Sequence, residues 1–352
     1  MSFSSVKEPA PMSLAAAGPD ALDHRRAVRW SEVRLIATVI AKRLLAGVVV
    51  LFIVTVLIFL FIHAAPGGPE VAIAGLDATP EQLAAIRELY RLDDPLPVQY
   101  WTYISSALTG DLGTSFMLRE PVADAIGRAL SGVTIPLIII TWTTALVFGV
   151  SLGYISARKR GQLLDRTIVG ITVVGATAPM FATGLLISTV FGVQLRWFPF
   201  FGSGSGGLDT LYHLVLPALT MVIVMLASTT RISRVRFAQV LEEDQYAFAK
   251  ARGVSPRAIF GRIIFRNSAV QLITWAGSVI VGLMTGLIIV EQIYSLPGIG
   301  SLLITAIGSR DIPMIQGITL VIAVAIVLVT IIVDVLCIIV DPRIRRGMEA
   351  DA

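Results

Sequence analysis

The chain has 352 residues, of which 55% are hydrophobic and only 15% are charged. Ordinary soluble domains carry about 25% charged residues, so this composition excludes a typical water-soluble enzyme and favours a membrane protein. A pI near 9.4 is also found in nucleic-acid-binding proteins, but the cations here lie beside apolar stretches and are not interleaved with aromatic residues. We therefore expect no nucleic-acid partner, and we interpret the basic excess as a signal of membrane topology.

Six apolar stretches are long enough to cross about 30 Å of hydrocarbon as helices. They cover residues 43–63, 133–156, 167–191, a stretch that starts near Tyr212 and includes Pro217, 270–293 and 313–337. The sequence thus predicts an all-α membrane protein with six transmembrane helices. The only cysteine, Cys337, lies in a predicted span, so no intrachain disulfide can form.

The segments around the first span have their own patterns. Residues 1–24 are rich in Ala, Ser and Pro, which predicts a disordered tail. Residues 25–44 repeat apolar side chains at helical spacing among arginines, which predicts an interfacial helix leading into the span; the alternative is an ordinary exposed basic helix. Residues 65–130 predict a soluble excursion with short helices that begin at a Thr79 capping box, near Pro97 and after Pro121.

The distribution of Lys and Arg predicts the orientation. Of the 28 basic residues, 22 lie in the N-terminal segment, the loop after the second span, residues 231–269 and the C-terminal tail, and six lie on the opposite side. This bias places both termini and the hairpin 231–269 in the cytoplasm. We divide the chain into a cytoplasmic tail with an interfacial helix (1–41), the first span with an extracytoplasmic segment (42–130), a five-helix core (131–341) and a second cytoplasmic tail (342–352).

Residues 231–269 form the longest polar interruption in the later part of the chain, and they carry eight cations. Their pattern predicts a helix, a break and a second helix. Gly253 ends the first helix, because a residue just past a helix end often takes a positive φ that glycine adopts freely. Ser255 then serves as N-cap and Pro256 as the first residue of the second helix. A bent helical hairpin between two spans is suited to serve as a docking site for another protein.

No catalytic or cofactor motif is recognisable in the sequence. The Walker A pattern is missing around all four lysines, and the three histidines lack metal-ligand spacing. These residues are Lys7, Lys42, Lys159, Lys250, His24, His63 and His213. We therefore expect no catalytic residue, no metal site and no cofactor bound by this chain.

The hairpin resembles the cytoplasmic loop of binding-protein-dependent ABC import permeases, in the branch that imports dipeptides, oligopeptides and nickel. The matching residues run from Asp244-Gln245-Tyr246 through Ala249-Lys250-Ala251-Arg252-Gly253 to Arg266-Asn267, with Ala247 and Arg266 in place of the family's Glu and Pro. Other segments follow the same branch in order across roughly residues 42–346. They include 92–100, 110–115, Pro179 with Phe181 and Gly184, Val290-Glu291, 297–300, Arg310-Asp311 and Asp341-Pro342-Arg343.

This resemblance implies a type I ABC importer permease in the inner membrane, with a similar second permease as its partner. It also implies two cytoplasmic ATP-binding subunits, or one fused pair, which hold ATP and Mg. An extracytoplasmic solute-binding protein, in contact with residues 65–130 and 192–212, would deliver the cargo. We expect small peptides as that cargo, and nickel chelates are the alternative within the same branch.

The resemblance further implies that a short helix from about Glu243 to Arg252 docks into a groove of the ATP-binding subunit. Small alanines would permit close approach, Tyr246 and Phe248 would be apolar anchors, and charges would form the rim. The docking residues we expect are Glu243, Asp244, Tyr246, Ala247, Phe248, Ala249, Lys250, Ala251, Arg252 and Gly253. The alternative is a helical loop that only covers its own spans.

Four further residues are candidates for the transport path or its hinges. Asp334 lies inside the sixth span, where an acid either lines the path or makes a structural bond between helices. Glu291 lies near the outer end of the fifth span, and we expect it to anchor a loop. Pro179 and Pro217 are either hinges for alternating access or kinks that shape the bundle.

Two other classes of protein are compatible with a multi-span chain. An ion-coupled secondary transporter needs charged residues within its spans, and only Asp334 qualifies. An intramembrane hydrolase needs a nucleophile and a base at membrane depth, and none is evident in the sequence. The sequence therefore favours an importer permease over both alternatives.

Overall fold

The structure is a computed structural model that describes residues 19–63, 70–71, 78–89 and 91–340. These residues form α-helices and three π-helical stretches; they include no β-strand beyond an isolated bridge between Thr114 and Pro121. Five helices are long and apolar enough to cross a membrane, and a bent helix pair can supply a sixth span. The prediction of an all-α membrane protein is confirmed.

Helix α1 (Pro19–His63) is one continuous helix of 45 residues. It joins the predicted interfacial segment to the first span without a break, and its apolar window is Ile40–Phe61. The position of residues 25–41 at the membrane surface stays a prediction. The predictions for the tail up to residue 18 and for residues 341–352 lie outside the described residues.

The segment after α1 contains the three short helices that the sequence predicts. They are α3 (Pro80–Leu89), α4 (Leu96–Leu108) and α5 (Val122–Ala129). The capping box is present, because the Thr79 N–H donates to Gln82 Oε1 at 3.0 Å and the Gln82 N–H donates to Thr79 Oγ1 at 3.3 Å. Helix α5 is not separate from the second span: it continues through η1 (Leu130–Thr134) into α6 (Ile135–Arg158) as one 37-residue helical run.

The third predicted span is not one straight helix. It consists of α7 (Leu163–Thr177) and of α8 (Met180–Ile187) with η2 (Ser188–Gln194), and the two parts are bent by 102°. The break falls at Ala178, which is extended (φ −70°, ψ 126°) and is followed by Pro179. A residue before proline is disfavoured in the α region, so the chain leaves the helix at this point.

The remaining helices complete the core and the hairpin. Helix α9 (Leu208–His213) leads into α10 (Val215–Leu241), which is followed by the short α11 (Asp244–Ala251). Then α12 (Pro256–Ile259), η3 (Phe260–Phe265) and α13 (Arg266–Ile293) form the 38-residue helical run of the fifth span. Helix α14 (Ile299–Gly308) is short and apolar, and α15 (Ile312–Val340) is the last span.

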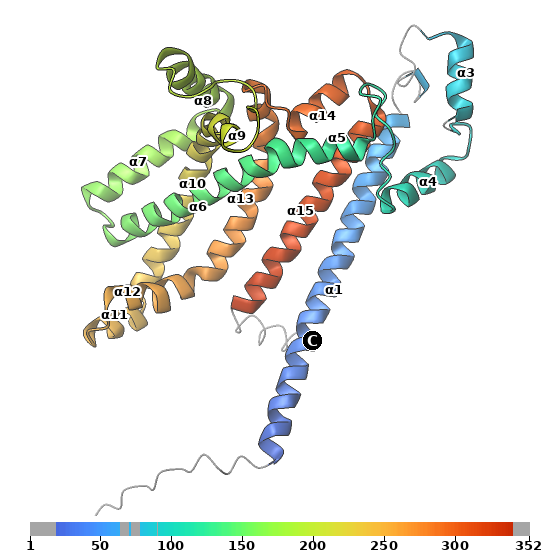
Figure 1. Cartoon of the computed structure of the whole chain (residues 1–352). Coiled ribbons are helices and arrows are strands. Elements are labelled where there is room, and N and C mark those ends of the chain that lie inside the picture. Colours follow the sequence, from blue (N-terminus) through green and yellow to red (C-terminus); the bar gives the residue numbers. More distant parts are fainter. Residues whose placement is uncertain (1–18, 64–69, 72–77, 90, 341–352) are drawn as a thin grey trace, which may run out of the picture.

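Figure 1 shows how these helices are arranged. Helices α6, α7, α10 and α13 form one group, and α15 lies between this group and α1. Helices α11 and α12 lie at the same end of the molecule as the start of α1 and the end of α15. Helices α5, α8, α9 and α14 lie at the opposite end. The hairpin therefore projects from one end of a helical bundle.

The most extensive helix contact in the core is between α6 and α10. Four small residues of α6 recur at four-residue spacing and are buried, namely Ala145, Gly149, Gly153 and Ala157. A Cβ atom on Gly149 would lie 2.7 Å from the Thr229 Cβ atom, and one on Gly153 would lie 2.6 Å from the Ser233 Cβ atom. Small residues at this spacing let helix backbones approach closely in membranes, where association depends on packing.

We expect Gly153→Ala to destabilise the protein, because the added methyl group would also lie 2.9 Å from the backbone nitrogen of Arg234, which cannot move aside freely. Overpacking of this kind costs about 1–3 kcal/mol. The matched control is Gly170→Ala in α7, where nothing lies within 4 Å of the added atom. Thermal unfolding of the purified membrane protein measures both. Equal melting temperatures for the two variants would contradict the close α6–α10 packing.

Candidate coupling site

Helix α11 is a short helix between the two limbs of the hairpin. Helix α10 stops at Leu241, and Glu243 is extended (φ −71°, ψ 144°) before α11 starts. The first limb predicted from the sequence is thus divided in two. At the other end, Gly253 has a φ of +70°, its N–H donates to the Lys250 carbonyl, and the Val254 N–H donates to the Ala249 carbonyl. This pair of bonds is a Schellman motif, so the predicted role of Gly253 as a helix stop is confirmed.

The second limb begins as the sequence predicts. Ser255 is the N-cap of α12, its hydroxyl oxygen accepts the Ala258 N–H, and Pro256 is the first helical residue. Asn267 at the start of α13 donates its side-chain amide to Gln245 Oε1 at 3.0 Å, and its carbonyl accepts from Arg236 Nη2 at 2.6 Å. These bonds connect α10, α11 and α13 at the base of the hairpin.

One face of α11 packs against the rest of this chain. Tyr246 and Ala249 contact a core cluster made by α6, α10, α12, η3 and α13. The cluster consists of Ala157, Phe237, Ala238, Val240, Ile259, Ile264 and Leu272. Aromatic edges add to it: the Tyr154 ring lies 5.7 Å from the Phe237 ring and 4.6 Å from the Phe260 ring. This packing fixes α11 on the end of the bundle.

The other face of α11 is exposed. Ala247, Phe248 and Ala251 are exposed on it, and 70% of the Phe248 surface is accessible. Of the two aromatic anchors predicted, only Phe248 points outward, because Tyr246 belongs to the inward face. An exposed phenylalanine between small alanines at the tip of a hairpin is typical of a protein contact surface.

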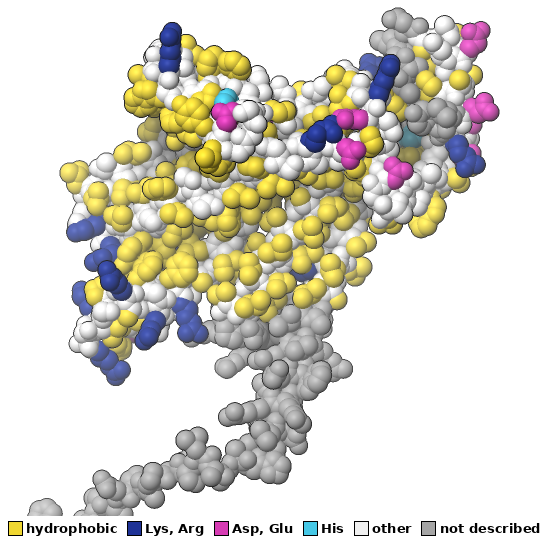
Figure 2. Space-filling model, viewed as in Figure 1, with side chains coloured by type: hydrophobic (Ala, Val, Ile, Leu, Met, Phe, Trp, Pro, Cys, Tyr) yellow, Lys and Arg dark blue, Asp and Glu magenta, His cyan; other side chains and the backbone are white. Residues whose placement is uncertain are grey.

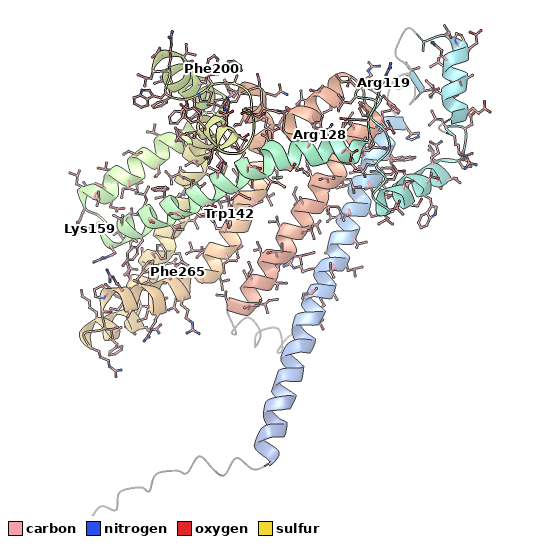
Figure 3. The ribbon with its side chains drawn as sticks, viewed as in Figure 1. Arg119, Arg128, Trp142, Lys159, Phe200 and Phe265 are labelled. Atoms are coloured by element: carbon pink, nitrogen blue, oxygen red, sulfur yellow. The ribbon has the colours of Figure 1, made fainter. Side chains whose placement is uncertain are left out.

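Charged residues surround this face. Glu243 and Asp244 are exposed at the start of α11, and Lys250 and Arg252 are exposed at its end, where each sign complements the helix dipole. In Figure 2, basic side chains gather at the end of the molecule that carries α11 and α12, while acidic side chains are visible at the opposite end. Figure 3 shows Lys159 and Phe265 towards the hairpin end, and Arg119 and Arg128 towards the other.

A buried ion pair holds α7 to α10 near the hairpin, and sequence reasoning missed it. Arg234 of α10 makes two parallel bonds of 2.7 Å to the carboxylate of Asp165, which is 3% exposed. The same carboxylate accepts from the Ser156 hydroxyl and from the Gly161 N–H. All three segments around it, the end of α6, the α6–α7 loop and α10, are thereby joined. The position of Asp165, an acid near arginines at the start of an apolar stretch, is the sequence signal that could have indicated an ion pair.

Glu291 anchors a loop, as the sequence predicts, and does not face an open path. It is fully buried and accepts from Thr134 Oγ1 at 2.9 Å, from the Gly300 N–H at 2.7 Å and from the Ser301 N–H at 2.9 Å. The two backbone donors belong to the first turn of α14. A carboxylate at a helix N-terminus satisfies free N–H groups and is favoured by the helix dipole.

Asp334 makes a bond between helices. Its Oδ2 atom lies 2.9 Å from Arg43 Nε, and this ion pair joins α15 to α1. The pair stands towards the end of the spans at which the hairpin lies. The geometry favours the structural role for Asp334 over a role in the transport path.

The two prolines differ in position. Pro179 stands at the 102° break between α7 and α8, where a change of backbone angle would move α8 relative to α7. Pro217 is buried in the first turn of α10, where its missing N–H removes no helical hydrogen bond. The geometry is thus consistent with a hinge at Pro179 and with a helix start, not a hinge, at Pro217.

Comparison with protein families gives two matches that together cover most of the chain. The family described as "Binding-protein-dependent transport system inner membrane component" matches residues 149–346, and "Binding-prot-dependent transport system membrane comp, N-term" matches residues 36–138. The chain belongs to this family of inner-membrane transport components. The hairpin with α11 lies within the first match.

Curated relatives agree with this assignment. The permease is 38% identical over 306 residues to proteins named "Glutathione transport system permease protein GsiC" from Escherichia coli strain K12 and from Shigella dysenteriae serotype 1. Each alignment covers 87% of this chain and 98% of the relative. The chain is therefore a multi-pass inner-membrane permease of the ABC importer type.

A solved structure shows the same fold. The permease matches a chain from a structure titled "Inward facing conformations of the MetNI methionine ABC transporter" with a TM-score of 0.52 and 14% sequence identity. The match covers 61% of the permease and 96% of that chain. The predicted type I ABC importer permease fold is confirmed. Among the described residues, no group of three His, Cys, Asp or Glu is placed to hold a metal ion.

We expect Asp165→Asn to destabilise the permease, because it leaves the Arg234 guanidinium without its ionic partner. The cost should be about 2–3 kcal/mol, at the lower end for a broken buried pair, since the Arg234 side chain is 25% exposed. The control is Glu242→Gln, which breaks the exposed Arg160–Glu242 pair and should cost less than about 1 kcal/mol. Thermal unfolding in detergent compares them. An equal loss in both variants would contradict the structural importance of the buried pair.

Proposed function

We propose that α11 is the site at which cytoplasmic ATP-binding subunits drive this permease. The observation that carries the proposal is the division of α11 into two faces: Tyr246 and Ala249 pack on the bundle, and Phe248 stands out from it. Such a helix is fixed to the bundle on one side and exposes an aromatic anchor on the other, so a subunit bound to the anchor can move the bundle. Two separate ATP-binding subunits or one fused pair would bind ATP and Mg and supply the energy for transport.

The orientation belongs to the same proposal. Both termini and the hairpin would lie in the cytoplasm, which the 22-to-6 distribution of basic residues supports. The arrangement in Figure 1 is compatible with it, since the start of α1, the end of α15 and the hairpin lie at one end. The opposite end, with α3 and the loop before α10, would then meet an extracytoplasmic solute-binding protein. A second, similar permease would share the central path.

The contacts between helices indicate how a movement of α11 would spread through the permease. Motion of α11 would pass to α10, from which only Glu242 and Glu243 separate it. Helix α10 would carry α6 with it through the close packing at Gly149 and Gly153, and α7 through the Arg234–Asp165 pair. The break at Pro179 would let α8 change its angle to α7. The central cavity between the two permeases would then open alternately to each side.

Small peptides are the cargo that we propose. The support is the 38% identity to permeases named for glutathione transport, over almost the whole length of those relatives. Glutathione is itself a tripeptide. Uptake of labelled glutathione and dipeptides by the reconstituted assembly tests this point, and uptake of a nickel chelate in their place would overturn it.

The docking proposal predicts that Phe248→Ala weakens binding of the ATP-binding subunits. A buried aromatic anchor is typically worth 2 kcal/mol or more at an interface, which corresponds to about a 30-fold loss of affinity. The control is Phe201→Ala, which removes an aromatic side chain that is 62% exposed and lies in the loop between η2 and α9. Affinity for the purified ATP-binding subunits is measured with the permease pair in nanodiscs.

Only the Phe248 variant should lose affinity, with a parallel loss of ATP-driven uptake. Unchanged affinity in that variant would show that the subunits bind elsewhere. A loss of uptake with normal affinity would place the role of Phe248 inside the permease, and this too would contradict the proposal.

A further inference from the structure

Helix α4 lies against the outer half of the first span, not above it. The Tyr100 hydroxyl is 2.8 Å from Thr55 Oγ1, and the Tyr100 ring packs edge-on against Phe59 with ring centres 5.5 Å apart. One residue earlier, Gln99 Oε1 lies 3.0 Å from His63 Nε2. Two successive residues of α4 thus fix it to one face of α1.

The position of Thr55 sets the depth of α4. Thr55 lies inside the apolar window Ile40–Phe61 of α1, six residues before its end. At 1.5 Å per residue this places it about 9 Å below the end of the window. A helix that touches Thr55 with a single tyrosine side chain therefore lies at the level of the membrane boundary. Figure 1 shows α4 beside the upper part of α1, below the top of α3.

One face of the free surface of α4 is apolar. The helix carries no charged residue, and Pro97, Trp101, Ile104 and Leu108 share one face at helical spacing. Trp101 is 70% exposed and Leu108 is 82% exposed. Thr102 and Thr109 stand on another face, about 100° or more around the helix from Leu108, and are exposed as well, with Val98 beside them. The helix thus has an apolar arc next to its α1-facing side and a more polar arc beyond it.

We propose that α4 is an interfacial helix whose apolar face is inserted into the outer leaflet of the membrane. Lipid is the occupant because α4 contacts α1 inside its apolar window, beside Phe52, whose ring lies 6.1 Å from the Tyr100 ring and which is itself 57% exposed. Tryptophan is enriched at this depth, since its amphipathic ring suits the headgroup region. The insertion goes beyond the proposed transport function and does not depend on the cargo.

The surroundings of Tyr103 support an apolar setting for α4. Its hydroxyl is buried and has no hydrogen-bond partner among the described residues. Burial raises the pKa of Tyr103 to about 12. The inserted helix would fix the depth of α1, while α3, with exposed Glu81, Arg87 and Glu88, stays in water. The predicted soluble excursion is then partly a membrane-surface element.

Spin labelling of the assembled transporter in lipid vesicles tests the insertion. Because Cys337 is the only cysteine of this chain, a Cys337→Ala background permits single labels at Leu108→Cys on the apolar face of α4, at Thr102→Cys on its polar face and at Ala84→Cys on α3. Retained uptake confirms that each variant folds. The accessibility of each label to oxygen, which concentrates in lipid, is compared with its accessibility to a water-soluble paramagnetic complex.

The expected ratio of oxygen accessibility to accessibility for the water-soluble complex is above one for Leu108→Cys and below one for Thr102→Cys and Ala84→Cys. A ratio below one at all three positions would show that α4 is surrounded by water, and it would overturn the proposal. Low accessibility of the Leu108→Cys label to both reagents would overturn it too, because it would show that another protein covers this face.

Discussion

The contact between α6 and α10 is the constraint on which the rest of this structure depends. In a membrane, helices gain little from hydrophobic burial against each other, so close backbone approach has to supply the association energy. Gly149 and Gly153 make that approach close enough for any added side-chain atom to collide with α10. Because α10 continues to within two residues of α11, the same contact connects the hairpin to the centre of the bundle.

Buried polar groups reinforce this unit at both ends. At the hairpin end, Asp165 receives four donors from three segments, and at the other end Glu291 receives three donors, one from η1 and two from α14. An ionisable group in a membrane protein is costly unless it is paired, so such a group marks a place where the helices must keep one arrangement. The more exposed Asp334–Arg43 pair joins α15 to the outer helix α1.

Much of this architecture can be predicted from the sequence because membrane helices obey simple rules. The length and hydropathy of the apolar stretches predict the spans. The residue types Gly253, Ser255 and Pro256 predict the turn of the hairpin. The sequence cannot show which side of a short helix faces inward, so it predicts the same anchoring role for Tyr246 and Phe248. The contacts separate them.

Tertiary partners account for the other differences. A proline inside an apolar stretch predicts a kink, but the size of the bend at Pro179 depends on how α8 packs against α10 and α13. Nothing in the sequence indicates that Asp165 pairs with Arg234, which is 69 residues further along the chain. The apolar face of α4 is visible in the sequence, whereas its depth follows only from the contact with Thr55.

If α11 receives the drive as proposed, α6, α10 and the hairpin should move as one body when ATP binds to the partner subunits. Distances between pairs of spin labels in the complete assembly test it most directly, with one label at Arg257→Cys on α12 and the other at Ile139→Cys on α6 or at Leu57→Cys on α1. ATP is expected to leave the α12–α6 distance unchanged and to shift the α12–α1 distance. A shift of the α12–α6 distance as large as that of the α12–α1 distance would contradict it.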